Sequence, residues 1–565
     1  MSIVHLLLSI ILSATSVTIT QPLDGETYDG DWLMLKAIVE NENEIPDSVS
    51  YVLNGSNGVP VARLNTDWYT YMANDLHTGY SEAPAPMDST ILWTAPVTGD
   101  YHEFPTPVVV EGVVYYPQDS TGDSLYALDA ATGDIIWKYR TGYTDDAVTV
   151  KEGFLYTSSD SLWCLNAFTG QRIWANGEAT SAASTPAVDD YFVYNCNPSY
   201  SGSPSTDVYC LDRYTGAVEW TVNVPGYAAS CLTVWNGMLL MPTWHGPLYA
   251  LDLGDGSVIW ENHDSGSGYW DSSPVMVDDV LYILGDDSYA RALDPFSGDE
   301  IWSALITPDT YLSATPAYYD QRLFFGDQED SYHCLDATDG SFFWSVQGPQ
   351  HGSSGVADGV VFYGEGSNYY DLTARILALD AEDGGVIWSY QTTTGPFGIV
   401  SSPSITDGVM YIAGTDNNLY AFGTGLKFTY RETDFFADIG SNQLIVTSWD
   451  DGSPVAADTI SFTVTQQGMT IGPRNRLALN VSPNPFYSST AITFSLTEPD
   501  MTSVTVFDLS GRLMATLESS QLSQGEHTLN WDGTDDHGRR LSPGLYLCRI
   551  QAGSLVRTTG LCLLR

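Results

Sequence analysis

Residues 124–137 read Ser-Leu-Tyr-Ala-Leu-Asp-Ala-Ala-Thr-Gly-Asp-Ile-Ile-Trp, and this stretch decides the fold of the chain. Its first residues alternate in the way expected of a strand. The Asp129 side chain can accept hydrogen bonds from the backbone N–H groups that follow it, and Gly133 can supply a left-handed residue. Ile135 to Trp137 then begin a second strand, so the stretch predicts a β-hairpin with a defined turn.

The same phrase, an Asp or Asn, a Gly and a Trp, each separated by three residues, occurs seven times. Successive tryptophans are 37 to 46 residues apart. A second hairpin precedes the phrase, as in residues 108–116, so each unit contains about four short strands, the size of one propeller blade. The glycines are Gly133, Gly170, Gly216, Gly256, Gly298, Gly340 and Gly384, and the tryptophans are Trp137, Trp174, Trp220, Trp260, Trp302, Trp344 and Trp388.

The last repeat unit is incomplete, and a strand that precedes the first unit supplies its missing part. Residues 402–422 contain the inner hairpin and a Leu-Tyr-Ala strand but lack the Gly and Trp of the phrase. Trp93 precedes Trp137 by 44 residues, in step with the other tryptophans. We therefore predict eight blades, with the strand around Trp93 closing the ring against residues 402–422 and removing free sheet edges. The tryptophans are interpreted as packing between blades.

The phrase Leu-Tyr-Ala-Leu-Asp-Ala-x-Thr-Gly-x-x-x-Trp resembles the pyrroloquinoline-quinone (PQQ) repeat over residues 89–424. This repeat builds quinoprotein alcohol dehydrogenases and also a non-enzymatic lipoprotein of the bacterial outer-membrane assembly machinery. The resemblance implies an all-β chain with an eight-bladed β-propeller. It leaves the function open, because the same blade serves enzymes, scaffolds and sensors.

The sequence argues against a bound quinone. Quinoprotein dehydrogenases of this family carry two adjacent cysteines, a Ca²⁺ site and long loops over the cofactor. Here the cysteines at 164, 196, 210, 231, 334, 548 and 562 are all isolated, and the units stay short. Residues 327–330 and 532–536 are acidic and could bind Ca²⁺, but they lack EF-hand spacing, and solvated turns are the favoured interpretation. We predict no cofactor and no metal site.

Segments flanking the propeller resemble immunoglobulin-like domains. Residues 17–88 and 425–466 resemble the first and last halves of one such domain, which needs roughly 100 residues. The propeller is then inserted between its strands, or, alternatively, two small β modules flank it. Residues 467–476 read as a linker. Residues 477–565 resemble the domain shared by flagellar-hook capping proteins (FlgD-like) and by cargo of the type IX (Por) secretion system, which implies a sorting role.

Composition restricts the partners. The chain has 70 Asp and Glu against 20 Lys and Arg, a formal charge of −50. This charge argues against nucleic acid and anionic membranes as partners, since both are polyanions. Residues 1–16 resemble a secretory signal peptide, and no later segment is long and apolar enough for a transmembrane helix. We expect an exported protein, extracellular or at the cell surface, with the periplasm as alternative.

No chemical motif stands out. The nine histidines show no metal-ligand spacing, and residues 352–355 do not form a nucleophile elbow. The aromatic pairs at 244–245 and 269–270 could line a face that binds sugar or peptide, although rim packing is the favoured interpretation. The sequence thus predicts no catalytic residue and a non-enzymatic platform that binds a protein or glycan, with the secretion machinery as partner of the C-terminal domain. A PQQ-dependent dehydrogenase and a structural spacer of the cell envelope are the alternatives.

Overall fold

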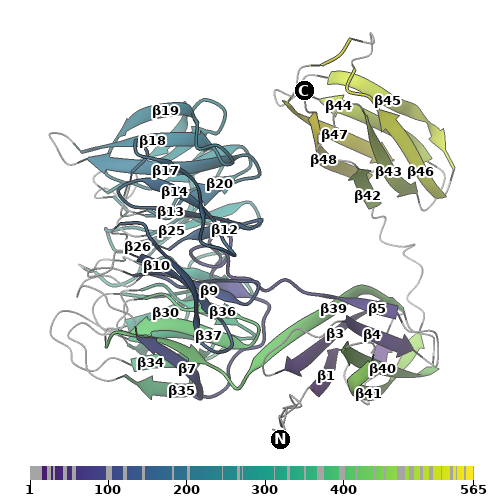
Figure 1. Ribbon diagram of the computed structural model, residues 1–565, viewed down its shortest axis with the longest axis horizontal. Coiled ribbons are helices and arrows are strands. Elements are labelled where there is room, and N and C mark those ends of the chain that lie inside the picture. Colours follow the sequence, from purple (N-terminus) through teal and green to yellow (C-terminus); the bar gives the residue numbers. More distant parts are fainter. Residues whose placement is uncertain are drawn as a thin grey trace, which may run out of the picture. The chain divides into compact units, whose positions relative to one another are not determined.

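The computed structural model describes residues 16–563 apart from short segments, of which the longest are 97–104, 366–374, 393–400 and 467–477. The described residues form 48 strands and no helix, as the all-β prediction requires (Figure 1). The chain divides into two compact units. Residues 34–435 make up most of the first unit and residues 462–565 most of the second.

Consecutive antiparallel strands form the first seven blades of a propeller, with the repeat Trp on the outermost strand of each. Blades 1 to 4 consist of β8–β11 (Val108–Val110, Val113–Gln118, Ser124–Asp129, Ile135–Arg140), β12–β15 (Thr149–Lys151, Phe154–Ser158, Leu162–Asn166, Arg172–Asn176), β16–β19 (Ala187–Val188, Phe192–Ser199, Ser205–Asp212, Val218–Pro225) and β20–β23 (Thr233–Trp235, Met238–Met241, Leu248–Asp252, Val258–Asn262). Blades 5 to 7 consist of β24–β27 (Val275–Val277, Val280–Leu284, Tyr289–Leu293, Glu300–Leu305), β28–β31 (Ala317–Tyr319, Arg322–Gly326, Ser331–Asp336, Phe342–Gln347) and β32–β35 (Gly355–Ala357, Val360–Glu365, Arg375–Asp380, Val386–Gln391).

One further sheet among the described strands combines the two ends of the repeat region. β36 (Ser404–Thr406), β37 (Val409–Gly414) and β38 (Asn418–Phe422) are completed by β7 (Ile91–Pro96), so that Trp93 lies opposite Ala421. The predicted pairing of the Trp93 strand is confirmed. The innermost strand of this sheet, β36, also contacts the innermost strand of blade 1, β8, which closes the ring.

Strands from before and after the propeller share one sheet. Its order begins β1-β3-β39-β5-β4-β40-β41, from β1 (Ser16–Gln21), β3 (Trp32–Asn41), β39 (Leu426–Phe436), β5 (Val59–Arg63), β4 (Ser48–Leu53), β40 (Gly440–Asp450) and β41 (Ser453–Gln466). This pairing is what insertion of the propeller into one domain requires. The domain boundaries themselves stay predictions.

In the second unit, β2 (Thr27–Asp29) pairs in parallel with the end of β41. The C-terminal domain has two sheets, β42-β43-β46 and β45-β44-β47-β48. Its strands are β42 (Ala478–Ser482), β43 (Thr490–Leu496), β44 (Asp500–Phe507), β45 (Leu513–Leu522), β46 (Gly525–Trp531), β47 (Gly544–Ala552) and β48 (Leu555–Leu563). Trp531, Phe494 and Ile550 are buried in its core, as expected of a sandwich packed face to face.

Candidate functional site

A segment from outside the repeats fills the centre of the propeller. Residues 64–82, called the hub strap below, include the short strand β6 (Tyr80–Ser81), which pairs with β32. The strap forms backbone hydrogen bonds with five innermost strands. These bonds join Trp68 to Val109, Tyr69 to Val150, Leu76 to Met276, Thr78 to Tyr318 and Gly79 to Val356.

Side chains connect the strap to two more blades. Thr66 donates a hydrogen bond to the Asp407 carboxylate in the β36–β37 turn, at 3.1 Å. His77 Nδ1 lies 3.0 Å from Thr233 Oγ1 on β20. Trp68 is fully buried among the innermost strands. The strap therefore occupies the propeller axis at the depth of these strands, although the sequence placed residues 64–88 with the immunoglobulin-like half domain.

The repeat tryptophans form one kind of joint between blades. The Trp260 ring lies against the backbone of Gly298 in the next blade, and its Nε1 donates a hydrogen bond to the Pro295 carbonyl at 3.0 Å. The same joint is made by Trp93, Trp137, Trp174, Trp220, Trp302 and Trp344 with Gly133, Gly170, Gly216, Gly256, Gly340 and Gly384. In each of these seven joints the indole N–H group already donates a hydrogen bond to the next blade.

The eighth joint differs. No turn of the repeat follows Trp388, and its Nε1 donates to the Pro86 carbonyl at 2.9 Å. The segment 83–90, which leads from the hub strap to β7, therefore replaces the missing turn. Ala83 and Ala85 of this segment are buried.

One face of the propeller is acidic. The turn between the two inner strands and the repeat turn of each blade lie at the same face, because backbone bonds such as Ala130 N to Gly112 O join them. We call this the hairpin face. The inner turns begin with Glu111, Glu152, Asp189, Asn236, Asp278, Asp320, Asp358 and Asp407, so seven of these eight positions are acidic. Most of these carboxylates are exposed, and the repeat turns add exposed acids such as Asp299.

Aromatic side chains stand out on the same face. Phe168, Tyr214 and Phe296 occupy the same position of the repeat turn in blades 2, 3 and 5, and they are 53%, 46% and 55% exposed. The aromatic pairs named from the sequence do not form such a surface in the described residues. Tyr269 is buried and Trp244 forms bridges with Tyr227 and Gly268, while residues 245 and 270 lie outside the described part.

The cysteines are core residues. Cys164, Cys210 and Cys334 each lie opposite the repeat Trp of a different blade, and burial raises the pKa of each thiol to about 12. Their thiols stay protonated near neutral pH and are poor nucleophiles. Six of the cysteines are buried, and the side chain of the seventh lies outside the described residues.

The carboxylates considered for Ca²⁺ have other partners. Asp327 accepts hydrogen bonds from Ser331 N at 2.9 Å and Thr307 Oγ1 at 2.8 Å, and it lies 3.2 Å from His333 Nε2. Together these partners outweigh burial and lower the pKa of Asp327 to about 2. Asp532 accepts from Thr534 in its own turn. The remaining residues of 328–330 and 535–536 lie outside the described part, and no cluster suited to a metal occurs within it.

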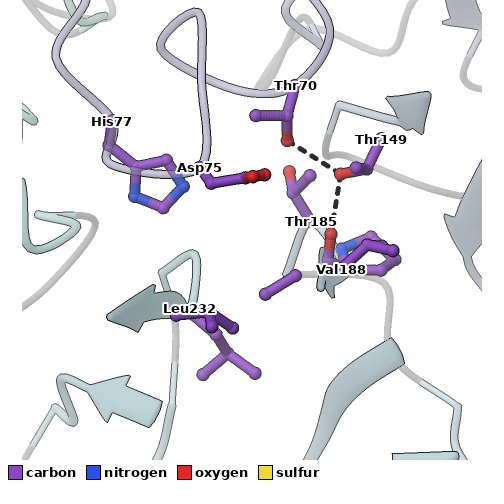
Figure 2. Close-up of a pocket in the computed structure, with 10 residues that line it drawn as sticks. Thr70, Asp75, His77, Thr149, Thr185, Val188 and Leu232 are labelled. Carbon is purple, nitrogen blue, oxygen red and sulfur yellow. Dashed lines mark hydrogen bonds between the residues drawn. The ribbon is translucent and has the colours of Figure 1, made fainter. Parts of the chain in front are cut away.

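A small pocket lies beside the hub strap (Figure 2). It is lined by Thr70, Asp75 and His77 of the strap, by residues of β12 and β16, and by Leu232 and Val234. Its interior volume is about 10 Å³, about the space of one water molecule, and the rest of the hollow opens to solvent.

The hub does not fit a redox quinone. A planar tricyclic cofactor on the propeller axis needs space where Trp68 and the other strap residues lie. The sequence also lacks adjacent cysteines. No step of a redox reaction can be derived from these residues.

Residues 82–198, 160–311 and 286–425 match the family model described as outer membrane protein assembly factor BamB, which together cover more than half of the chain. Residues 484–555 match the model described as FlgD Ig-like domain. The outer membrane protein assembly factor BamB of Yersinia pestis is 28% identical over 210 residues, or 36% of this chain and 45% of that protein. The chain therefore matches less than half the length of this relative.

Solved structures support the fold. The chain resembles quinohemoprotein alcohol dehydrogenases from Pseudomonas putida HK5 and Comamonas testosteroni, with TM-scores of 0.52 and 0.53 and 15% identity. The likeness covers 66% and 67% of this chain and 81% and 82% of those chains. At this identity it shows the propeller fold alone. The part of the chain that the structure describes contains no helix with the length and hydropathy of a membrane span.

Sequence reasoning missed the hub strap. Residues 64–79 have no strand alternation but contain Trp68, Tyr69, Tyr71 and Met72, which is an unusual number of large side chains for a loop. That density is the signal that could have indicated a buried segment, since loops at a surface are usually polar. Nothing in the sequence indicated which strands it would join.

Proposed function

Because the chain belongs to the family described as outer membrane protein assembly factor BamB, we propose that its propeller is a non-enzymatic platform that binds other proteins. The occupied hub is the observation that carries this proposal. The strap binds the innermost strands where a cofactor would need space, so the outer surfaces of the ring remain for recognition. The C-terminal FlgD-like domain has a separate core and is a second module.

The hairpin face is the proposed binding surface, and a basic polypeptide segment is the proposed partner. Its acidic turns attract and orient cationic partners. Phe168, Tyr214 and Phe296 supply exposed rings that can pack on Lys and Arg side chains through cation–π contacts. Arg213 already stacks on Tyr214 in this way, at 4.8 Å from the ring centroid.

The protein is proposed to be exported. The signal-like residues 1–16 lie mostly outside the described part, and the C-terminal domain would contact the secretion machinery. The relative's printed name refers to outer-membrane assembly, which supports a place in the cell envelope, with the cell surface and the periplasm both open.

Binding to peptide arrays of graded charge tests the proposal. We expect the full chain to bind Lys- and Arg-rich peptides and to lose affinity as ionic strength rises, because salt screens exposed charges. The triple variant Asp278→Asn, Asp279→Asn, Asp299→Asn should weaken this binding at least fivefold, since Asn keeps the turn geometry but removes the charge.

Three exposed acids away from the hairpin face serve as a matched control. The variant Asp160→Asn, Glu178→Gln, Glu261→Gln changes net charge equally and should bind like the parent chain. Equal losses in both triple variants would overturn the assignment of the face. Blank protein and glycan arrays would instead favour a spacer. Addition of PQQ and Ca²⁺ followed by a quinone absorbance band, or by dye-linked alcohol oxidation, would support the dehydrogenase.

A further inference from the structure

Seven of the eight inner turns on the hairpin face begin with an acid, and Asn236 is the exception. Asn236 and Gly237 are the two central residues of the turn between β20 and β21, in which Trp235 lies opposite Met238. Both have left-handed backbone angles, with φ of 44° and 81°. Asn followed by Gly is the pair that such a two-residue turn accepts with the least strain.

The side chain of Asn236 is not held by the fold. Asn236 and Gly237 are both exposed. Among the described residues, neither the Asn236 amide nor the Gly237 N–H has a hydrogen-bond partner. The turn contacts its blade through the Gly237 carbonyl, which accepts a hydrogen bond from Leu253 N at 3.1 Å. No atom lies within 4 Å of a Cβ built on Gly237, so the space beside this residue is open.

A second Asn-Gly pair within the described residues, at 176–177, is held in place. Asn176 Oδ1 accepts hydrogen bonds from Glu178 N at 2.8 Å and from Ala179 N at 3.2 Å. Its Nδ2 donates to the Gly216 carbonyl of the next blade at 3.0 Å. The two pairs have the same dipeptide sequence, but the amide of Asn176 makes three hydrogen bonds that the amide of Asn236 lacks.

We propose that Asn236 is a self-modification site, at which the side-chain amide is converted to a carboxylate by reaction with water. The Gly237 nitrogen loses its proton to hydroxide and attacks Asn236 Cγ, and ammonia leaves as the new C–N bond closes a five-membered succinimide. Water then opens this ring. Addition at Cγ gives Asp, and addition at the main-chain carbonyl gives isoaspartate. Each conversion consumes one water molecule and releases one ammonia.

The fold favours this reaction at Asn236 over Asn176. Ring closure requires a rotation about the Asn236 backbone, and an exposed turn opens at a lower free-energy cost than a segment bonded into a blade. Gly237 adds to this freedom, because it has no side chain to shield its nitrogen or restrict its φ. At Asn176 the same rotation must break the bond to Gly216 and the two bonds to the following backbone.

The new carboxylate would give all eight inner turns a negative charge. Asp is as compatible with this turn as Asn, so the hairpin can keep its shape. The consequence for binding rests on the proposed function, because a basic partner is what would sense the added charge. One further exposed ion pair should strengthen binding about two- to fivefold.

Peptide mapping by mass spectrometry tests the modification without any partner. The full chain is incubated at mildly alkaline pH, and the peptides that contain residues 236 and 176 are followed for the mass difference between Asp and Asn. In the folded chain we expect conversion at 236 to be about tenfold faster or more, because the bonds of Asn176 must open first. In the chain unfolded in urea, the two rates should become alike. Equal rates in the folded chain, or faster conversion at 176, would overturn the proposal.

Two variants test the consequence separately, with an oligolysine peptide as the probe. Asn236→Asp should bind it about two- to fivefold more tightly than the fresh parent chain, and Asn236→Gln should bind like the parent. Thermal unfolding checks that both variants are folded. Conversion at 236 together with unchanged binding by folded Asn236→Asp would sustain the modification and place the failure in the binding surface assigned to the hairpin face.

Discussion

Seven joints between the blades are built alike, whereas the eighth is built from a different part of the chain. In the seven, a Trp contacts a turn 30 to 39 residues away in sequence. In the eighth, Trp388 bonds to Pro86, which is 302 residues away. Each repeated joint is formed by residues of two consecutive blades, which are close in sequence. The eighth requires segment 83–90, which precedes all the repeats in the sequence.

This difference extends to the hub. The repeated units supply nearly the same strands and turns, but the hub strap occurs once and joins seven blades through different residues. Long-range contacts carry a larger loop-closure entropy cost than local ones. Because the strap bonds to seven blades, we expect these blades to unfold together.

Removing a Trp from each kind of joint has the largest expected effect. Trp260→Ala and Trp388→Ala remove side chains of similar burial, 8% and 7% exposed, and each should reduce the free energy of unfolding by about 3–5 kcal/mol. Urea unfolding measures this loss. Limited proteolysis should separate the two variants, because only Trp388→Ala releases segment 83–90 from its partner.

Equal protection of residues 83–90 in the two variants would show that the eighth joint does not depend on Trp388. A loss below about 1 kcal/mol in Trp260→Ala would contradict the role assigned to the repeated joints, since such a loss is typical of a surface position.

Prediction from the sequence succeeded where the chain repeats itself. The spacing of Trp93 from Trp137 was enough to place β7 in the sheet that contains Tyr420. In a repeat of nearly constant length, the spacing shows which residues occupy equivalent positions. The hub strap could not be predicted in this way. Its bonds involve backbone atoms of Trp68, Leu76 and Gly79, and any sequence offers such atoms. The small pocket beside the strap was not predicted either, because the residues that line it lie far apart in the sequence.

The hub strap should make stability depend on pH between about 4 and 6.5, because it buries His77. His77 has a folded-state pKa of about 4 against an ordinary value of 6.5, because burial disfavours the charged ring. The folded state therefore binds fewer protons than the unfolded state between these values, and stability is full above pH 6.5 and falls as the pH decreases toward 4. The loss at pH 4 should be about 3 kcal/mol, from 1.36 kcal/mol per pKa unit.

Urea unfolding of the parent chain and of His77→Asn at pH 7 and pH 4 measures this contribution. Asn does not titrate, so the variant should lose about 3 kcal/mol less than the parent over this interval. Asp327 provides an internal contrast, because its lowered pKa of about 2 places its loss of stability below pH 4. An identical pH dependence in parent and variant would contradict the assignment to the strap.

Two glycine substitutions test how tightly the repeated joint is packed, and we expect them to have the smallest effect on stability. Gly298 and Gly112 have nearly equal φ angles of 76° and 77°. A Cβ atom at 298 would lie 2.6 Å from the Trp260 ring, whereas nothing lies within 4 Å of one at 112. Gly112→Ala should therefore show the backbone cost alone, about 1 kcal/mol. Gly298→Ala should cost about 1–3 kcal/mol more, because the ring cannot move aside without losing its bond to Pro295. Thermal unfolding of both variants isolates the contact from the backbone strain, and equal losses would mean that the Trp ring yields and the joint is not tightly packed.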